Sequence, residues 1–391
     1  MIDGKNRYMR VRADGNPCGG SPIWRWEVNV APPGASRDRR WGTEATKAKA
    51  VAAVVRVQRE AEAGELVDRS RATLEEFLFK TWLPAVEPTL APSTVLSYRN
   101  ILKARVVPTL GSTPLQSLTA TQLNSLYAQL LANGRANAPG ALSARSVRYT
   151  HTVLRKALKD ACRWGLVARN VADLANPPKL TKTRKWTTWS PVEIRTFLRA
   201  VKIDRLSSLW ELAVNTGMRR GELLGLRWDD VDLDSGTVAI RRALVVVGYE
   251  VVVSQTKTDR ARSIALDPGT VAILKDWRRA QLEERLAWGP AWIDSGYVHT
   301  KENGESLHPD ETSKRFNRLV ALAGVPRIRF HDVRHTWAST ALAAGVHPKI
   351  VAERLGHGSI QITLDTYSHV MPQQDRAAGE LVASLYRSAT T

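Results

Sequence analysis

The side chains best suited to chemistry lie in a short stretch near the C-terminus. Two residues separate His331 from Arg334, His357 follows a glycine, and Tyr367 closes the stretch. An arginine binds phosphate oxygens through a planar fork of donors, and a neutral histidine accepts a proton near neutral pH. A tyrosine can become a covalent nucleophile if its surroundings stabilise the phenolate, because a free phenol ionises only at about pH 10. Together these groups predict attack on a phosphodiester without a metal.

Length and composition limit the number of domains and the class of partner that the protein can have. The 391 residues carry a formal net charge of +19 and are 43% hydrophobic, which is enough for two or three domains with real cores. A chain this basic favours nucleic acid as its partner, with a generic basic housekeeping protein as the alternative. The two cysteines, Cys18 and Cys162, form neither a zinc motif nor a disulfide framework. Because no apolar run reaches transmembrane length and no signal-peptide core is present, the expected location is the cytoplasm.

The N-terminal residues 1–66 predict a small module of strands followed by a helix. Alternation over residues 8–12 and 24–30 predicts two strands, residues 39–41 a third, and residues 46–62 have helical spacing. The strands mix arginine with aromatic residues. A basic sheet of this kind can lie in a DNA groove, and a small structural cap is an equally good interpretation.

Residues 70–178 predict an all-helical domain. Capping boxes at residues 73–76 and 119–122 each indicate the start of a helix, and residues 143–164 form a long predicted helix with one apolar face. Its other face carries cations that indicate a solvated surface or, given the net charge, a DNA-facing one. These cations are Arg145, Arg148, Arg155, Lys156 and Lys159. The proline-led basic residues 177–185 predict an interdomain linker.

Residues 186–391 predict the domain that holds the reactive stretch. Ser190 and Glu193, with a proline between them, indicate the start of its first helix. Runs of β-branched residues at 237–255 and 263–266 predict one small antiparallel sheet, after which helical patterns return. The whole chain is therefore expected to be mainly α with small β-sheets (α+β).

The order and spacing of the motifs resemble those of tyrosine recombinases, the phage-integrase family. Five elements carry the resemblance, and together they are far more specific than a lone His-x-x-Arg box. They are residues 216–228 around Arg219, Lys257 within residues 255–258, His331 with Arg334, Gly356 with His357, and Tyr367. The resemblance covers at least residues 190–371. Ten positions separate the last histidine from the tyrosine, one more than in some family members.

The resemblance implies a role for each group. Arg219 and Arg334 would bind the equatorial phosphate oxygens, where charge builds as Tyr367 attacks phosphorus. His331 would receive the phenolic proton or bond the phosphate, and His357 would add a donor. The lysine of the family's β-hairpin would protonate the departing 5′-hydroxyl. The resulting 3′-phosphotyrosine stores the bond energy, so another 5′-hydroxyl can reseal the strand without ATP, a metal or another cofactor.

The cationic assignments each have a structural alternative. Arg219 can be a helix C-terminal cation that balances the helix dipole, although its position after Thr-Gly favours phosphate binding. Lys257 can be an ordinary turn lysine, with Arg260 and Arg262 nearby. His331 and His357, each taken alone, are better interpreted as buried, hydrogen-bonded histidines. Because Arg334 lies between them in the sequence, the interpretation as site residues is preferred.

The tyrosine also has alternatives. Tyr367 can be a core phenol, and Tyr297 and Tyr386 are rival nucleophiles, but neither rival follows a Gly-His pair at the same separation. Neighbouring polar residues are expected to support the site without reacting. They are His335 as a structural or supporting histidine, and Glu222 and Asp332 as orienting or packing carboxylates.

The implied activity is site-specific DNA recombination by a three-domain integrase. Residues 1–66 would bind arm-type DNA, residues 70–178 would be a SAM-like core-binding domain, and residues 186–391 would be catalytic. Double-stranded DNA at core and arm sites is the expected partner, in a bacterial cell and away from membranes. The resemblance further implies four protomers in the synaptic complex, an excisionase, a DNA-bending host factor, and a C-terminal helix (379–386) that docks on a neighbouring protomer.

Other functions stay open at this point. A chromosome or plasmid dimer resolvase of the same family usually lacks an extra N-terminal module, so residues 1–66 argue against it. A non-catalytic DNA-binding regulator that kept the fold is disfavoured by the complete set of reactive residues. Topoisomerase activity of type IB shares the chemistry and is conceivable as a side reaction.

Overall fold

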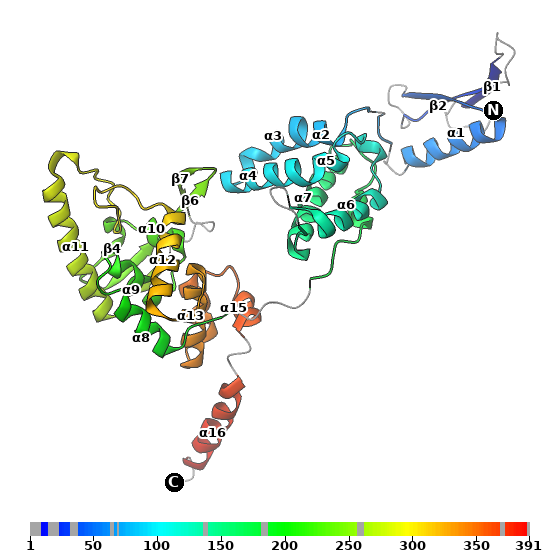
Figure 1. The fold of residues 1–391 in the computed structure, drawn as a ribbon. Helices are drawn as coiled ribbons and strands as arrows, with labels where there is room; N and C mark the ends of the chain where they lie inside the picture. The colour runs from blue at the N-terminus through cyan, green and yellow to red at the C-terminus, as the bar shows by residue number, and fades with distance from the viewer. Residues whose placement is uncertain are drawn as a thin grey trace. The chain divides into compact units, whose positions relative to one another are not determined.

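The computed structural model describes residues 9–14, 23–31, 38–62, 66–68, 70–135, 140–180, 187–255, 262–367 and 372–388. The chain divides into two compact units, Met1–Lys182 and Thr183–Thr391 (Figure 1). The described residues are mainly helical with small antiparallel sheets, which confirms the predicted fold class. None of the described helices is both long and apolar enough to cross a membrane.

A three-stranded antiparallel sheet with one helix opens the first unit, as the sequence predicted. Trp26 and Val28 are buried against the helix, because alternate residues of a strand share one face. The opposite face presents Arg25, Arg39 and Trp41 to solvent. The elements, in sheet order and then the helix, are β1 (Met9–Asp14), β2 (Ile23–Asn29), β3 (Arg39–Glu44) and α1 (Lys47–Glu62).

The rest of the first unit is the expected helical domain. Both predicted capping boxes are confirmed: the hydroxyls of Thr73 and Thr119 accept backbone N–H groups, and Glu76 and Gln122 return the bonds. The elements are α2 (Leu74–Glu76), η1 (Phe77–Trp82), α3 (Leu83–Val86), η2 (Glu87–Thr89), α4 (Pro92–Ile101), η3 (Leu102–Val106), α5 (Val107–Leu110), η4 (Leu115–Ser117), α6 (Ala120–Asn133), α7 (Ala144–Arg163) and η5 (Val171–Leu174).

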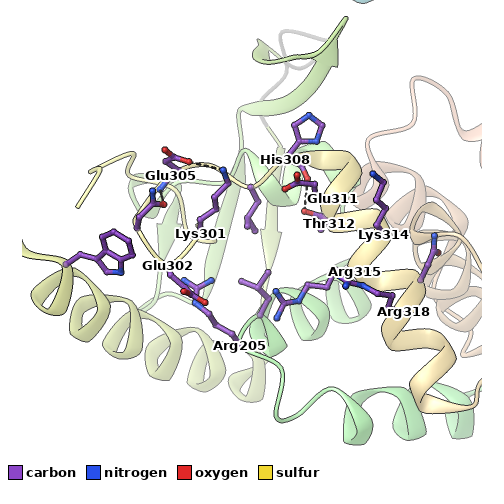
Figure 2. Close-up of a pocket in the computed structure, with 15 residues that line it drawn as sticks. Arg205, Lys301, Glu302, Glu305, His308, Glu311, Thr312, Lys314, Arg315 and Arg318 are labelled. Atoms are coloured by element: carbon purple, nitrogen blue, oxygen red, sulfur yellow. Dashed lines mark hydrogen bonds and ion pairs between the residues drawn. The ribbon is translucent and has the colours of Figure 1, made fainter. Parts of the chain in front are cut away.

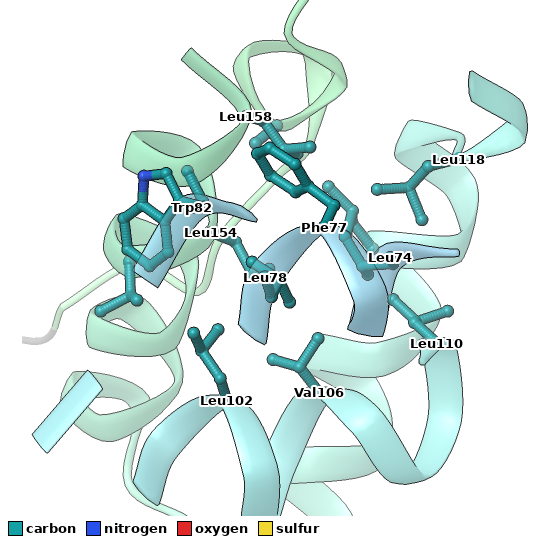
Figure 3. Close-up of a cluster of buried hydrophobic side chains, with 14 of the residues drawn as sticks. Leu74, Phe77, Leu78, Trp82, Leu102, Val106, Leu110, Leu118, Leu154 and Leu158 are labelled. Carbon is teal, nitrogen blue, oxygen red and sulfur yellow. The ribbon is translucent and has the colours of Figure 1, made fainter. Parts of the chain in front are cut away.

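One apolar core holds these helices together. Figure 3 shows Phe77 and Leu78 pointing into a cluster with Leu102 and Leu154, which come from distant parts of the chain. Trp82 is also buried, and its indole Nε1 donates to a carboxylate oxygen of α7 at 2.9 Å. That bond satisfies the one polar atom of the indole, so the ring adds apolar contact without an unpaired donor.

The cationic face of α7 is partly used within the unit. Arg155 pairs with Asp173 at 2.5 Å, and the ammonium of Lys156 lies 5.6 Å from the ring centroid of Tyr98. Arg145 and Lys159 are exposed on the same helix. The predicted basic face therefore exists, with some of its charge already paired.

The second unit combines helices with two small antiparallel sheets. The sequence predicted a single sheet, and the structure corrects this: β5 pairs with β8, while β6 and β7 form a separate hairpin. The strands are β4 (Val231–Asp232), β5 (Thr237–Ile240), β6 (Arg242–Val247), β7 (Glu250–Gln255) and β8 (Arg262–Ala265). The helices are α8 (Pro191–Ala200), α9 (Ser207–Thr216), α10 (Arg220–Leu224), η6 (Trp228–Asp230), α11 (Pro268–Trp288), η7 (Gly289–Ala291), α12 (Pro309–Ala323), α13 (Phe330–Ala343), α14 (Pro348–Leu355), α15 (Ile360–Tyr367) and α16 (Pro372–Ser388).

An aromatic cluster positions the helices that carry the reactive residues. Trp189, Phe197, Trp210, Phe316 and Phe330 lie within 4.9 to 6.0 Å of their ring neighbours. Such tilted and edge-to-face pairs add to the apolar burial of the rings. Because α9 and α13 both contribute to this cluster, the residues that follow α9 and those on α13 come close together.

Candidate active site

Four separate elements bring the predicted site residues to one place in the second unit. Arg219 precedes α10, His331 and Arg334 lie on α13, His357 follows α14, and Tyr367 ends α15. Arg334 interacts electrostatically with all four of the other groups. The sixth predicted residue, Lys257, lies outside the described residues.

Arg219 is oriented by a buried carboxylate. Its Nη1 donates to Glu222 Oε1 at 2.8 Å, and its backbone N–H donates to Oε2 of the same residue at 2.9 Å. The Arg219 Nη2 donates to the carbonyl of Gly356 at 3.0 Å. The side chain remains 42% exposed, so part of the guanidinium faces solvent. These contacts hold Glu222 against Arg219, which fits the orienting role, one of the two roles that the sequence suggested for this carboxylate.

Arg334 is buried and bonded to two backbone carbonyls. Only 3% of the residue is exposed, and its guanidinium donates to the carbonyls of Gly217 (3.0 Å) and Leu355. Gly217 ends α9 with a left-handed φ of 64°, which turns its carbonyl out of the helix towards α13. Burial, and then the positive charge of Arg219, lower the pKa of Arg334 to about 9.

The two guanidiniums converge on the C-terminal end of α14. Leu355 and Gly356 are consecutive, and their carbonyls accept from Arg334 and Arg219 respectively. The last carbonyls of a helix have no partner inside it, so they are available to orient donors from elsewhere. Two like charges held this close repel each other, and an anion between them would relieve the repulsion. The two guanidiniums therefore offer donors to an anion placed between them.

The histidine that contacts the tyrosine is His335. Its Nδ1 lies 2.6 Å from the Tyr367 hydroxyl, while His331 makes an edge contact with the His335 ring at 5.3 Å between centroids. The resemblance implied that His331 receives the phenolic proton or bonds the phosphate, and His335 was expected to be structural or supporting. In the structure the Nδ1 of His335 is within proton-transfer distance of the Tyr367 hydroxyl, because His335 lies one helical turn further along α13 and faces α15.

His357 lies beside the arginines and is bonded to α15. Its Nδ1 is 2.8 Å from the Thr363 hydroxyl, which fixes the ring orientation. Burial, followed by the charges of Arg334 and Arg219, lowers the pKa of His357 to about 4. The ring is therefore neutral at physiological pH, and Nε2 is the nitrogen left to bond a ligand.

Tyr367 is both a core residue and a site residue. Only 2% of it is exposed, and it packs in a cluster with Ala338, Leu342, Val351 and Leu355. Burial raises the pKa of its hydroxyl to about 12. The phenol is thus fully protonated near neutral pH and needs a base to become a nucleophile, and His335 is in contact with it.

Comparisons with known proteins match both the second unit and part of the helical domain to one family. The Phage integrase family model matches residues 190–374, and the model of the phage integrase N-terminal SAM-like domain matches residues 73–131. The chain belongs to the phage integrase family. It is a tyrosine recombinase of the integrase type, as the motifs indicated.

Relatives of this recombinase extend over most of the chain. A XerC-like tyrosine recombinase of Caldanaerobacter subterraneus is 29% identical, covering 82% of this chain and 85% of the relative. The ICEBs1 integrase of Bacillus subtilis is 24% identical, covering 82% and 86%. The integrase of Mycobacterium phage L5 is 28% identical, covering 82% and 81%.

Solved structures share the fold. The Tn1549 transposon integrase in complex with a circular intermediate DNA has a TM-score of 0.65 at 19% identity, covering 80% of this recombinase and 99% of that chain. A lambda integrase dimer bound to a COC′ core site has a TM-score of 0.57 at 18% identity, covering 90% and 93%. At these sequence identities, the similarity shows a shared fold alone.

One cavity of the recombinase is lined by other residues of the second unit. It has a volume of about 960 Å³, and Figure 2 shows Lys301, Glu305, His308 and Lys314 around it. Its lining mixes both signs of charge, and Lys301 pairs with Glu305 at 2.8 Å. None of the predicted site residues that the structure describes lines this cavity, and no cluster of three or more metal-binding side chains occurs among the described residues.

The recombinase should lose stability in mild acid because of its site histidines. Burial lowers the pKa of His335 and His357 to about 4, and also lowers that of His331, whereas an unfolded histidine titrates at about 6.5. Between these values the unfolded chain binds more protons, so unfolding becomes easier as the pH falls from about 6.5 towards 4. Urea unfolding at about pH 7, 5.5 and 4.5 measures this. A midpoint independent of pH would contradict it, and His335→Gln should flatten the dependence.

Arg262 is the site neighbour whose role the sequence did not predict. It was named only as a residue near Lys257. In the structure it contacts Glu222 and the backbone of Arg354. The local sequence, a polar turn followed by a strand, gives no signal that the first residue of the strand, Arg262, contacts Glu222 forty positions earlier.

Proposed function

We propose that this recombinase integrates a phage or another mobile element by cutting and rejoining DNA through a 3′-phosphotyrosine at Tyr367. The observation that carries the proposal is the convergence of two guanidiniums at the end of α14, beside the Tyr367–His335 pair. Two arginine forks can bind the non-bridging oxygens of one phosphodiester. The phenol of Tyr367 supplies the nucleophile, and the neutral imidazole of His335, hydrogen-bonded to its hydroxyl, supplies the base.

The proposed reaction is a transesterification at phosphorus. The Tyr367 oxygen attacks, its proton passes to His335, and the bond from phosphorus to the 5′-oxygen breaks. Arg219 and Arg334 bind the equatorial oxygens as negative charge builds there, and His357 adds a further donor. The departing 5′-oxygen takes a proton from Lys257, the residue the family motif places in this role. Attack by another 5′-hydroxyl reverses the steps and releases the tyrosine.

The buried phenol has a consequence for this reaction. Because Tyr367 as a whole is only 2% exposed, a phosphodiester can reach its oxygen only if α15 shifts when DNA binds. Ile360 and Ile362 on this short helix are exposed, and among the described elements the helix packs mainly against α13 and α14. We infer a resting position in which His335 is hydrogen-bonded to the phenol before DNA binds.

Double-stranded DNA is the proposed substrate and partner. The net charge of +19, the exposed cations of α7 and the basic outer face of the β1–β3 sheet support it. The structures of the Tn1549 and lambda integrases contain DNA, and the lambda protein is a dimer on its core site. A tetramer on paired core sites, with an excisionase and a DNA-bending factor, would complete the reaction.

Trapping the covalent intermediate tests the proposal. A duplex nicked close to the cleavage point loses its short 5′-hydroxyl fragment by diffusion, so the protein–DNA ester accumulates. The full chain, incubated with such a core site, should form an adduct that survives denaturing gel electrophoresis, and peptide mass spectrometry should place it on Tyr367. A chain that binds the site but forms no adduct, or forms it on another residue, would refute the assignment.

Removing residues 1–66 should separate cleavage from integration. The truncated chain keeps the helical domain and the second unit, so adduct formation on a core site should stay within about twofold of the full chain. Integration in cells should fall by at least about tenfold if the β1–β3 sheet binds arm DNA. Trp41→Ala removes an exposed ring without touching the buried face and should weaken arm binding alone. Normal integration by the truncated chain would end the arm-binding interpretation.

A further inference from the structure

Arg262, the first residue of β8, makes three hydrogen bonds at the edge of the active site. Its Nη1 and Nη2 donate to Glu222 Oε1 and Oε2 at 3.1 and 2.6 Å, and its Nε donates to the carbonyl of Arg354 at 2.9 Å. The side chain is 15% exposed, and that of Glu222 is 3% exposed. All these contacts are therefore largely removed from water. Charge-assisted hydrogen bonds are strongest in such low-dielectric surroundings.

We propose that Arg262 is a positioning residue that keeps Arg219 in place and free to bind the scissile phosphate. The proposal rests on the function argued above, in which Arg219 is a phosphate ligand.

The first step is the shared carboxylate. Glu222 accepts from both Arg219 and Arg262, and each of its oxygens receives two bonds. With Arg219 as the only cation, the whole charge of Glu222 would act on Arg219 and compete with a phosphate for it. The second guanidinium shares that charge. Burial alone would raise the pKa of Glu222, but Arg262 and Arg219 reverse this and lower it, so the carboxylate is ionised.

The second step is the contact with the loop that follows α14. Gly356 has a left-handed φ of 65°, and a Cβ added there would lie 2.7 Å from Arg262 Nη1. The guanidinium therefore lies directly against this glycine, whose carbonyl accepts from Arg219. The next residue is His357. Arg262 thus contacts both groups that orient Arg219, namely the carboxylate of Glu222 and the backbone at Gly356.

A lysine at this position would keep the charge but lose the paired geometry, because an ammonium cannot bond both oxygens of Glu222 and the Arg354 carbonyl with one planar fork. Arg262→Lys should slow single-turnover adduct formation on the nicked core site about 10- to 100-fold. Core-site affinity should stay within about twofold, since Arg262 is not proposed to touch DNA.

Arg242 provides a matched control. It begins strand β6 of the separate hairpin and pairs with another buried carboxylate, Asp230, at 2.7 Å. Arg242→Lys breaks a comparable pair in the same unit without involving Glu222. It should leave the rate of adduct formation unchanged while showing a similar loss of thermal stability. If Arg242→Lys slows cleavage as much as Arg262→Lys, the effect is general loosening and the proposal fails.

A double-mutant comparison shows whether Arg262 acts through Arg219. In an Arg219→Ala background, adding Arg262→Lys should change the residual rate less than about twofold, because the group to be positioned is gone. A full 10- to 100-fold effect in that background would overturn the proposal. The absence of any adduct with the unmodified chain would instead contradict the proposed function, whereas an Arg262→Lys rate equal to that of the unmodified chain would contradict this inference alone.

Discussion

Tyr367→Phe is expected to abolish covalent protein–DNA adducts on nicked core sites. The substitution removes the one oxygen that can bond phosphorus and keeps the ring, which fits the cluster of Ala338, Leu342, Val351 and Leu355. His335 loses its hydroxyl partner, which should cost only about 1 kcal/mol of stability. Core-site binding measured by gel shift should therefore be unchanged, while adducts on denaturing gels fall below detection.

Two other tyrosines are rival nucleophiles, and the exposed one provides a control for that result. Tyr386 is 76% exposed on α16, and Tyr297 is buried beside Arg227, whose guanidinium lies 5.1 Å from its ring centroid. Tyr386→Phe should form adducts at the normal rate. If Tyr367→Phe still forms adducts, the nucleophile lies elsewhere, and Tyr386→Phe then shows whether the exposed tyrosine supplies it.

Local features of this chain were predictable from sequence. The hydroxyl of Thr73 and the side chain of Glu76 lie within one turn of each other, so a capping box forms from neighbouring residues alone. The same is true of Arg219 and Glu222, three positions apart at the start of α10. The motif residues were recognisable because their order along the chain matches a family.

Contacts between distant segments were not predictable in this way. Runs of β-branched residues predicted the strands, but β5 pairs Ile240 with Arg262 and not with its neighbour β6, which divided the expected sheet in two. The choice between His331 and His335 depended on which face of α13 meets α15. That choice is set by the packing of Tyr367 into the α13–α14 cluster, and the motif spacing carries no information about it.

The two site arginines are expected to fail differently when each is replaced by alanine. Arg219→Ala and Arg334→Ala should each slow adduct formation about 100- to 1000-fold, since each removes a donor that stabilises charge on the phosphate. Arg219 is partly exposed, and Glu222 keeps Arg262 as a partner, so its loss should cost about 1 kcal/mol or less. Arg334 is buried, and its loss leaves the carbonyls of Gly217 and Leu355 without a donor, which should cost about 3 kcal/mol or more.

Parallel measurements of urea unfolding and single-turnover cleavage separate the two effects. Arg219→Ala should unfold close to the midpoint of the unmodified chain and still cleave poorly, which assigns its loss to the reaction. Arg334→Ala should unfold earlier, and its cleavage must be measured at a temperature where the chain remains folded. Cleavage at the normal rate by either folded variant would remove that arginine from the phosphate site. A normal unfolding midpoint for Arg334→Ala would mean that its bonds to the two carbonyls do not hold the end of α14 to α9, and the convergence of the two guanidiniums would lose its structural basis.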